Sequence, residues 1–159
     1  MTFDEFKNNV EQWAAGRGIY EHSTPEAQLL KALSELGELA DAVIKDDRDA
    51  LKDAIGDVAV CMVNYAFMVD RFFDMNDIEN HTEYCEDVET AIGFMASVIG
   101  GLITDESIEF PESVMALLMD TAEDKYGLYF MDCCEHAWDQ IKDRRGRMVP
   151  GGAFVKDES

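Results

Sequence analysis

Residues 28–64 carry the most informative alternation of apolar and polar positions in the chain, and they predict two helices. In the first, apolar side chains recur every three or four residues, the spacing of one helical face. These apolar positions are Leu29, Leu33, Leu36, Ala40 and Val43. The opposite stripe consists of Gln28, Lys31, Glu35 and Glu38. We expect this helix to begin at Thr24-Pro25, a capping residue followed by the residue type that suits the first helical position.

The segment 54–69 predicts a second helix that is buried on all sides. Its residues are apolar on every face apart from Asp57 and Asn64. A lone charge inside such a helix is costly, so we expect Asp57 to be neutral, paired or bound to a cation. Asp53 lies one turn before Asp57 and Asn64 two turns after it, so the three share one face. Carboxylates of both predicted helices are therefore expected to face each other.

The other apolar repeats predict helices as well, and we find no alternating pattern of a strand and no hairpin turn signal. The expected segments are 2–15, 49–72, a helix capped by Thr82 that ends near Gly100-Gly101, a helix that opens at Phe110-Pro111, and 131–145. The sequence therefore predicts an all-α protein. Its 159 residues suit one domain with a sizeable core.

Composition narrows the functional classes. The net charge is −21, from 13 basic and 34 acidic residues, which opposes binding to nucleic acid backbones and to anionic membranes. Four cysteines without C-x-x-C spacing predict reduced core residues rather than a zinc or redox site. The longest apolar run is too short for a bilayer and no leader pattern opens the chain, so we expect a cytoplasmic protein.

The far end of the chain concentrates positive charge. Four of the 13 basic residues lie within six positions, and they are Lys142, Arg144, Arg145 and Arg147. Cations at a helix C-terminus offset the helix dipole, which accounts for one or two of them. The concentration in so acidic a chain favours an anion site. The glycine-containing tail at 146–159 could close over a ligand.

Several short stretches of the sequence resemble those of one known protein family. The stretches Q-L-L-K-A-L-S-E-L-G-E-L, I-G-D within an apolar helix, I-K-D-R-R-G-R-M and the final G-x-F-V-K resemble the MazG-like nucleotide pyrophosphohydrolases of the all-α NTP pyrophosphatase superfamily, and the tail is similar to phage-encoded members. The likeness covers roughly residues 13–70 and 128–156, and residues 75–125 look like an inserted helical pair. If the chain is phage-encoded, its expected location is the host cytoplasm.

The resemblance implies cleavage of a nucleoside triphosphate between its α and β phosphates, with Mg²⁺, or Mn²⁺ in its place, held by E-x-x-E and E-x-x-D motifs. Glu35 and Glu38 match the first motif and Asp57 matches the last position of the second. Ala54 stands where the second motif has glutamate, and Asp53 is our hypothesis for its replacement. Attack by a metal-bound water is expected, and Glu38 would help to take its proton.

The resemblance also implies the remaining contacts. The phosphates would be held by Lys31, Lys142, Arg144 and Arg145. The nucleoside would meet Asn64, and Trp13, beside the Gly16-Arg17-Gly18 loop, either belongs to the core or stacks on the base. The family's habit of pairing subunits and the apolar excess of the helices suggest a homodimer or homotetramer.

Two other classes compete with this interpretation. A di-iron carboxylate bundle uses Glu-x-x-His, but His22, His81 and His136 are preceded at that spacing by Ile19, Ile78 and Cys133. In a non-catalytic acidic interaction protein, the negative charge itself would provide the function by binding a partner. Such a protein would not need an aspartate within an apolar helix.

Overall fold

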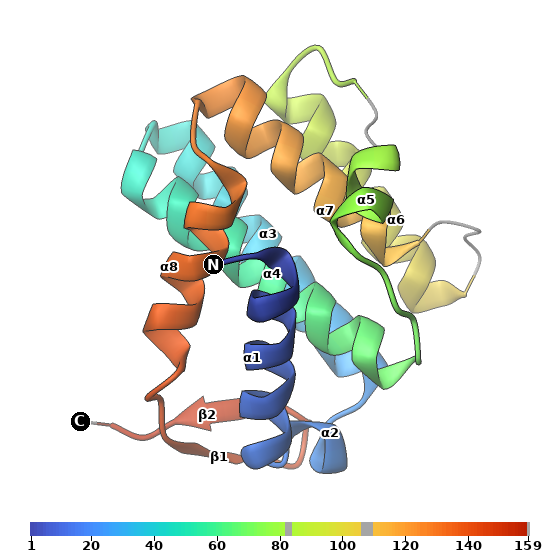
Figure 1. Ribbon diagram of the computed structural model, residues 1–159, viewed down its shortest axis with the longest axis vertical. Helices are drawn as coiled ribbons and strands as arrows, with labels where there is room; N and C mark the ends of the chain where they lie inside the picture. Colours follow the sequence, from blue (N-terminus) through green and yellow to red (C-terminus); the bar gives the residue numbers. More distant parts are fainter. Residues whose placement is uncertain (82–83, 106–109, 159) are drawn as a thin grey trace.

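Two long antiparallel helices form the centre of the molecule and carry the acidic positions. The computed structural model describes residues 1–81, 84–105 and 110–158. Helix α3 (Pro25–Lys45) packs along α4 (Arg48–Met68), and the two are joined by a tight turn (Figure 1). Asp46 closes that turn in the left-handed conformation, with φ 52°. This geometry brings the polar stripe of α3 against the polar face of α4.

Capping residues fix where these central helices begin. The hydroxyl of Thr24 accepts a hydrogen bond from the amide of Ala27 at 3.1 Å, and Pro25 occupies the first turn of α3. Asp47 accepts one from the amide of Ala50 at 3.0 Å at the start of α4. The predicted start of the first helix is thereby confirmed, because cap and proline act as the sequence indicated.

Helix α4 forms the buried axis that its composition predicts. It is surrounded by α1 (Phe3–Gly16), α3, α7 (Pro111–Asp120) and α8 (Phe130–Ile141). Gly56 permits close packing of α4 against α8, because a Cβ atom there would lie 2.3 Å from the carbonyl oxygen of Cys133. The four cysteines are buried free thiols, as predicted.

The middle of the chain forms a layer that covers α3 and α4. It consists of α5 (Met75–Asn80), α6 (Val88–Thr104), α7 and a π-helical turn at Thr121–Lys125. Helix α6 packs on α3 and α7, and α7 packs on α4. Asp87 caps α6 through the amide of Thr90, whereas Thr82, the predicted cap, lies outside the described residues.

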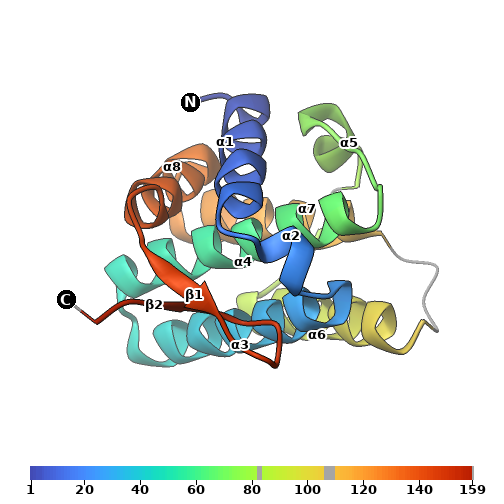
Figure 2. The same cartoon turned by 90° about the horizontal axis from the view of Figure 1, so that it is seen from below.

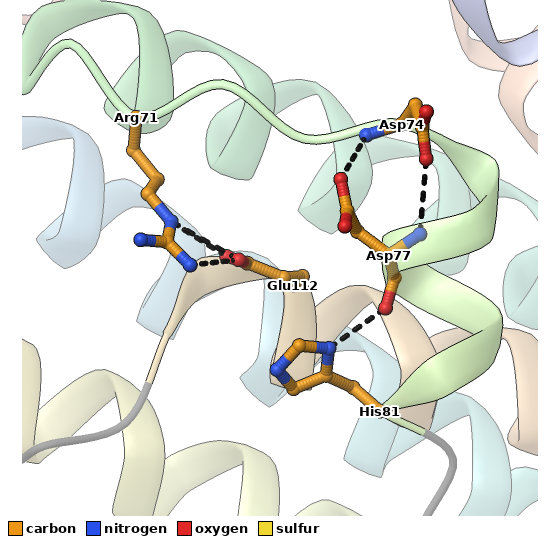
Figure 3. Close-up of polar contacts among 5 residues, drawn as sticks. All are labelled: Arg71, Asp74, Asp77, His81 and Glu112. Atoms are coloured by element: carbon orange, nitrogen blue, oxygen red, sulfur yellow. Dashed lines mark hydrogen bonds and ion pairs between the residues drawn. The ribbon is translucent and has the colours of Figure 1, made fainter.

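An ion pair between the buried Glu112 and the partly exposed Arg71 attaches this layer to the end of α4. Glu112 is 2% exposed, and Nε of Arg71 donates a hydrogen bond to its Oε1 at 3.0 Å (Figure 3). The Arg71 guanidinium also lies 4.2 Å from the ring centroid of Phe110. In α5, Asp74 and Asp77 form a reciprocal capping box. These contacts hold α5 and α7 in place and lie apart from the cavity described below.

The C-terminal segment forms a hairpin that the sequence analysis did not expect. Strand β1 (Gly146–Met148) pairs antiparallel with β2 (Phe154–Lys156), beneath the end of α1 (Figures 1 and 2). The pattern gave no strand signal because each strand has three residues and its packing comes from distant helices. The all-α prediction is otherwise confirmed, since the remaining secondary structure of the described residues is helical.

Several sequence-based boundaries and faces need correction. Helix α4 ends at Met68 rather than near Phe72, and α8 ends at Ile141 rather than Arg145. Leu33, assigned to the apolar face, is 41% exposed, because the buried face of α3 runs through Ala32 and Leu39 instead. Within the described part of the chain, no helix is long and apolar enough to cross a membrane.

Candidate functional site

A cavity of about 590 Å³ opens between α3, α4, the end of α8 and the C-terminal hairpin. This volume is within the range of sites that hold small molecules. It brings together residues from both ends of the chain, and Figure 2 shows the hairpin crossing beside α3 and α4. The predicted site residues that line it are Trp13, Lys31, Glu35, Asp57, Asn64 and Arg144. Six of the predicted residues therefore share one cavity.

Glu35 is the buried acid of α3. Its residue is 6% exposed, although it was assigned to the stripe opposite the apolar face. Within this stripe Gln28 and Glu35 are buried whereas Lys31 and Glu38 are exposed, so only part of the stripe turns away from solvent. Its Oε1 is 2.6 Å from the Nζ of Lys31, one turn earlier on the same helix. Burial opposes the charge of Lys31, but the hydrogen bond and charge of Glu35 raise the Lys31 pKa overall.

The carboxylates of the site influence one another's ionisation. Burial, with the charges of Glu35 and Asp53, raises the pKa of Asp57 to about 7, although the charges of Arg144 and Lys31 oppose the shift. The neighbouring charge of Glu35 is the main reason that the pKa of Glu38 is also raised. The site thus holds more negative charge than its own cations offset.

The two other acidic candidates lie at the edge of this group. Glu38 is exposed and Asp53 is paired with the Nε2 of His136, and neither lines the cavity. Across residues 1–81, 84–105 and 110–158, no three His, Cys, Asp or Glu side chains are grouped closely enough to hold a metal ion. Ala54, in place of the expected glutamate, is buried in the core.

The structure separates the four basic candidates. Lys31 and Arg144 line the cavity, from α3 and from the turn after α8 respectively. Lys142 is exposed and lies 2.7 Å from Asp139, and Arg145 is exposed and does not line the cavity. Two of the four are therefore positioned to meet an anion inside it.

The nucleoside candidates occupy the side of the cavity next to α1. Asn64 is buried, and its Oδ1 accepts a hydrogen bond from the hydroxyl of Tyr20 at 2.8 Å. The ring of Tyr20 stacks on Phe67, with centroids 4.1 Å apart. Trp13 is both a core residue and a cavity residue, and no hydrogen-bond partner for its Nε1 is found among the described residues.

The sequence predicted that the tail at 146–159 could close over a ligand, but it missed the hairpin within that tail and the contact that Gln28 makes. Residues 151–155 of the hairpin line the cavity, and Gly152 fits against Ala27 and Ser23 with φ +82°. Gln28 was predicted on the polar stripe but given no role, and its Nε2 donates to Ser23 at 3.0 Å. The glycine-rich tail was the available signal for the hairpin, because only glycine readily adopts that φ.

Comparisons with known proteins match the part of the chain that forms α3 and α4. Residues 23–83 match the model of the MazG nucleotide pyrophosphohydrolase domain. The "uncharacterized 18.2 kDa protein in rep-hol intergenic region" of Haemophilus phage HP1 (strain HP1c1) is 49% identical over 55 residues, which are 35% of this chain and 34% of that protein. No solved structure matches the chain significantly. Residues 23–83, which include α3, α4 and all four candidate carboxylates, are thus the part of the chain that is similar to the MazG nucleotide pyrophosphohydrolase domain, and the chain spans about a third of the length of the phage protein that it matches.

Proposed function

We propose that this chain is a Mg²⁺-dependent nucleoside triphosphate pyrophosphohydrolase that converts a (d)NTP and water into a (d)NMP and diphosphate. The domain match supports this class of reaction. The observation that carries the proposal is the shared cavity, in which Glu35 and Asp57 lie with Lys31 and Arg144. Carboxylates for a metal and cations for phosphates are both needed for phosphoanhydride chemistry.

The acidic residues suit a hard divalent cation. Carboxylate oxygens are preferred ligands of Mg²⁺, and Mn²⁺ accepts the same ligands. The pKa of Asp57 is raised first by burial and then by neighbouring acids, and the pKa of Glu38 is raised mainly by the charge of Glu35; a bound cation would offset these effects. Glu35 and Asp57, which line the cavity, would hold it, and Glu38 and Asp53 would have to turn towards it to complete the set, because the four carboxylates are not grouped closely enough in this structure. When bound, the ion supplies positive charge to the phosphate oxygens and lowers the pKa of a coordinated water.

The chain's own residues would then position the substrate and move a proton. Glu38 accepts the proton of the attacking water, helped by the raised pKa that the charge of Glu35 gives it. Lys31 and Arg144 bind the phosphates inside the cavity, and Lys142 and Arg145 attract them from outside it. The attack is in line with the departing diphosphate.

The nucleoside would lie towards α1. With Oδ1 of Asn64 occupied by Tyr20, its Nδ2 group remains to donate to a sugar or base oxygen. The buried Nε1 of Trp13 lies near the same wall. Both residues are therefore proposed to contact the nucleoside.

We also propose that the chain forms a homodimer or homotetramer. Helix α3 exposes three apolar side chains: Leu30, which lines the cavity, is 58% exposed, Leu33 is 41% exposed and Ile44 is 83% exposed. An apolar stripe of this kind is typical of helices that pack against a partner. Sedimentation analysis of the whole chain tests this assembly, and a monomer at all concentrations would contradict it.

Diphosphate release from a panel of canonical and modified nucleotides tests the function. We expect release with Mg²⁺, loss in EDTA, and loss in Asp57→Asn under conditions where that variant is folded. Asp143→Asn, an exposed aspartate outside the cavity, is the matched control. Silence across the whole panel would favour the alternative, a non-catalytic acidic helical interaction protein.

A further inference from the structure

Arg17, which has no assigned role, links the end of α1 to the segment that follows α8. Its Nε donates a hydrogen bond to the carbonyl oxygen of Arg144 at 3.0 Å. A terminal guanidinium nitrogen of Arg17 is 3.3 Å from the carbonyl oxygen of Lys142. These two carbonyls lie just beyond the helix end, where backbone acceptors have no partner within the helix. One side chain therefore caps a helix more than a hundred positions away in the sequence.

The same guanidinium reaches the nucleoside side of the cavity. It lies 5.4 Å from the ring centroid of Trp13, within the range of a cation–π contact. Trp13 in turn meets Phe154 of the hairpin edge to face, with centroids 5.6 Å apart. Arg17 thus touches the segment carrying Arg144 on one side and a cavity wall on the other.

We propose that Arg17 is a positioning residue for substrate binding, which sets where the Arg144 guanidinium and the hairpin wall lie. This inference rests on the proposed function of the cavity. Arg17 itself does not line the cavity, so it acts through Arg144 and Trp13. The carboxylates lie on α3 and α4, which Arg17 does not contact in any described hydrogen bond, ion pair or ring contact. Its loss should therefore weaken binding of the phosphates and leave the hydrolytic step intact.

Steady-state kinetics separate these effects. For Arg17→Gln we expect KM to rise about tenfold, equivalent to about 1.4 kcal/mol of binding free energy, with kcat changed less than about twofold. Arg17→Lys should recover part of the loss, because one ammonium can still donate to a carbonyl. Arg48→Gln, an exposed arginine away from the cavity, is the matched control. A fall in kcat without a change in KM would overturn the proposal.

A double variant tests whether Arg17 works through Arg144. If it does, Arg17→Gln combined with Arg144→Gln binds no more weakly than Arg144→Gln alone. If the double variant instead loses affinity by the product of the two single losses, Arg17 does not act through Arg144. Thermal unfolding of each variant shows whether the comparison is made between folded proteins.

Three measurements that need no turnover distinguish failure of this inference from failure of the proposed function. With Trp138 replaced by Phe, Trp13 is the remaining tryptophan, and Arg17→Gln should increase its quenching by acrylamide. Amide exchange should also rise at Val149 and Asp157, whose backbone hydrogen bonds hold the hairpin. Calorimetry should show that the Arg17→Gln variant binds inorganic tripolyphosphate about tenfold more weakly than the wild type. If Arg17→Gln leaves quenching, exchange and tripolyphosphate binding unchanged, the proposed role of Arg17 is wrong. If these three properties change as expected but the wild type hydrolyses no nucleotide, only the proposed reaction is wrong.

Discussion

The ammonium of Lys31 lies 2.6 Å from the buried Oε1 of Glu35, at the wall of the cavity. This internal cation partly neutralises an acidic cluster that the chain otherwise leaves in excess. A divalent ion bound by Glu35 would release Lys31 for a phosphate. The pair therefore connects folding stability, metal binding and substrate binding.

We expect Lys31→Met to lower the free energy of unfolding by about 1 to 2 kcal/mol in EDTA, because it leaves the charge of Glu35 without its nearest partner. Mg²⁺ should raise the melting temperature more in this variant than in wild type. Lys45→Met is the matched control, since Lys45 pairs with the exposed Asp41 at 2.7 Å. An equal response of both variants to Mg²⁺ would refute the link between the pair and the metal.

The raised pKa of Asp57 predicts how stability depends on pH. Its pKa is about 7 in the folded chain against an ordinary value of 3.8. The folded chain thus retains this proton longer than the unfolded one, and stability falls as pH rises between these values. In EDTA, Asp57→Asn should be more stable than wild type at pH 8, by about 1 to 3 kcal/mol, and near equal at pH 4. Urea titrations at both pH values measure this, and a less stable variant at pH 8 would contradict it.

Asp53 remains a hypothesis for the ligand missing at Ala54. If it belongs to the metal site, Asp53→Asn should raise the Mg²⁺ concentration for half-maximal turnover about tenfold. His136→Gln is the comparison variant: it removes the hydrogen-bond partner of the Asp53 carboxylate but keeps that carboxylate, and His136 does not line the cavity. Unchanged kinetics and Mg²⁺ dependence in Asp53→Asn would remove that residue from the site.

Gly56 should be essential for the packing of α4 against α8. A Cβ there would lie 2.3 Å from a backbone carbonyl oxygen, so Gly56→Ala should cost about 2 to 3 kcal/mol of unfolding free energy. Gly37→Ala should instead gain about 0.5 to 1 kcal/mol, because a Cβ at Gly37 meets nothing within 4 Å. Chemical denaturation compares the two, and equal effects would refute the steric explanation.

The stability cost of burying the Glu112 carboxylate should depend on its ion pair with Arg71. Arg71→Met leaves its carboxylate unpaired and should cost about 3 kcal/mol. Adding Glu112→Leu should restore part of that stability, since the double variant contains no stranded charge. Diphosphate release per folded molecule should be unchanged, because the pair lies outside the cavity lining.

The sequence alone was enough to predict the helices at the centre of the fold. The cap at Thr24 and the apolar run around Asp57 depend on neighbours within a few turns, so local rules reach them. The same local information placed carboxylates on facing sides of α3 and α4. It also located the cationic cluster after α8.

Only the tertiary structure decided which of these candidates meet. Arg144 reaches the cavity whereas Lys142 and Arg145 do not, because the turn after α8 directs neighbouring side chains differently. Glu35 was predicted on the polar stripe of α3, but it is buried because α4 packs against α3. The hairpin and its anchor Arg17 were beyond sequence reasoning because both depend on contacts between residues at opposite ends of the chain. Spacing along one helix fixes the direction of a side chain, whereas its partner across the fold depends on how the whole chain packs.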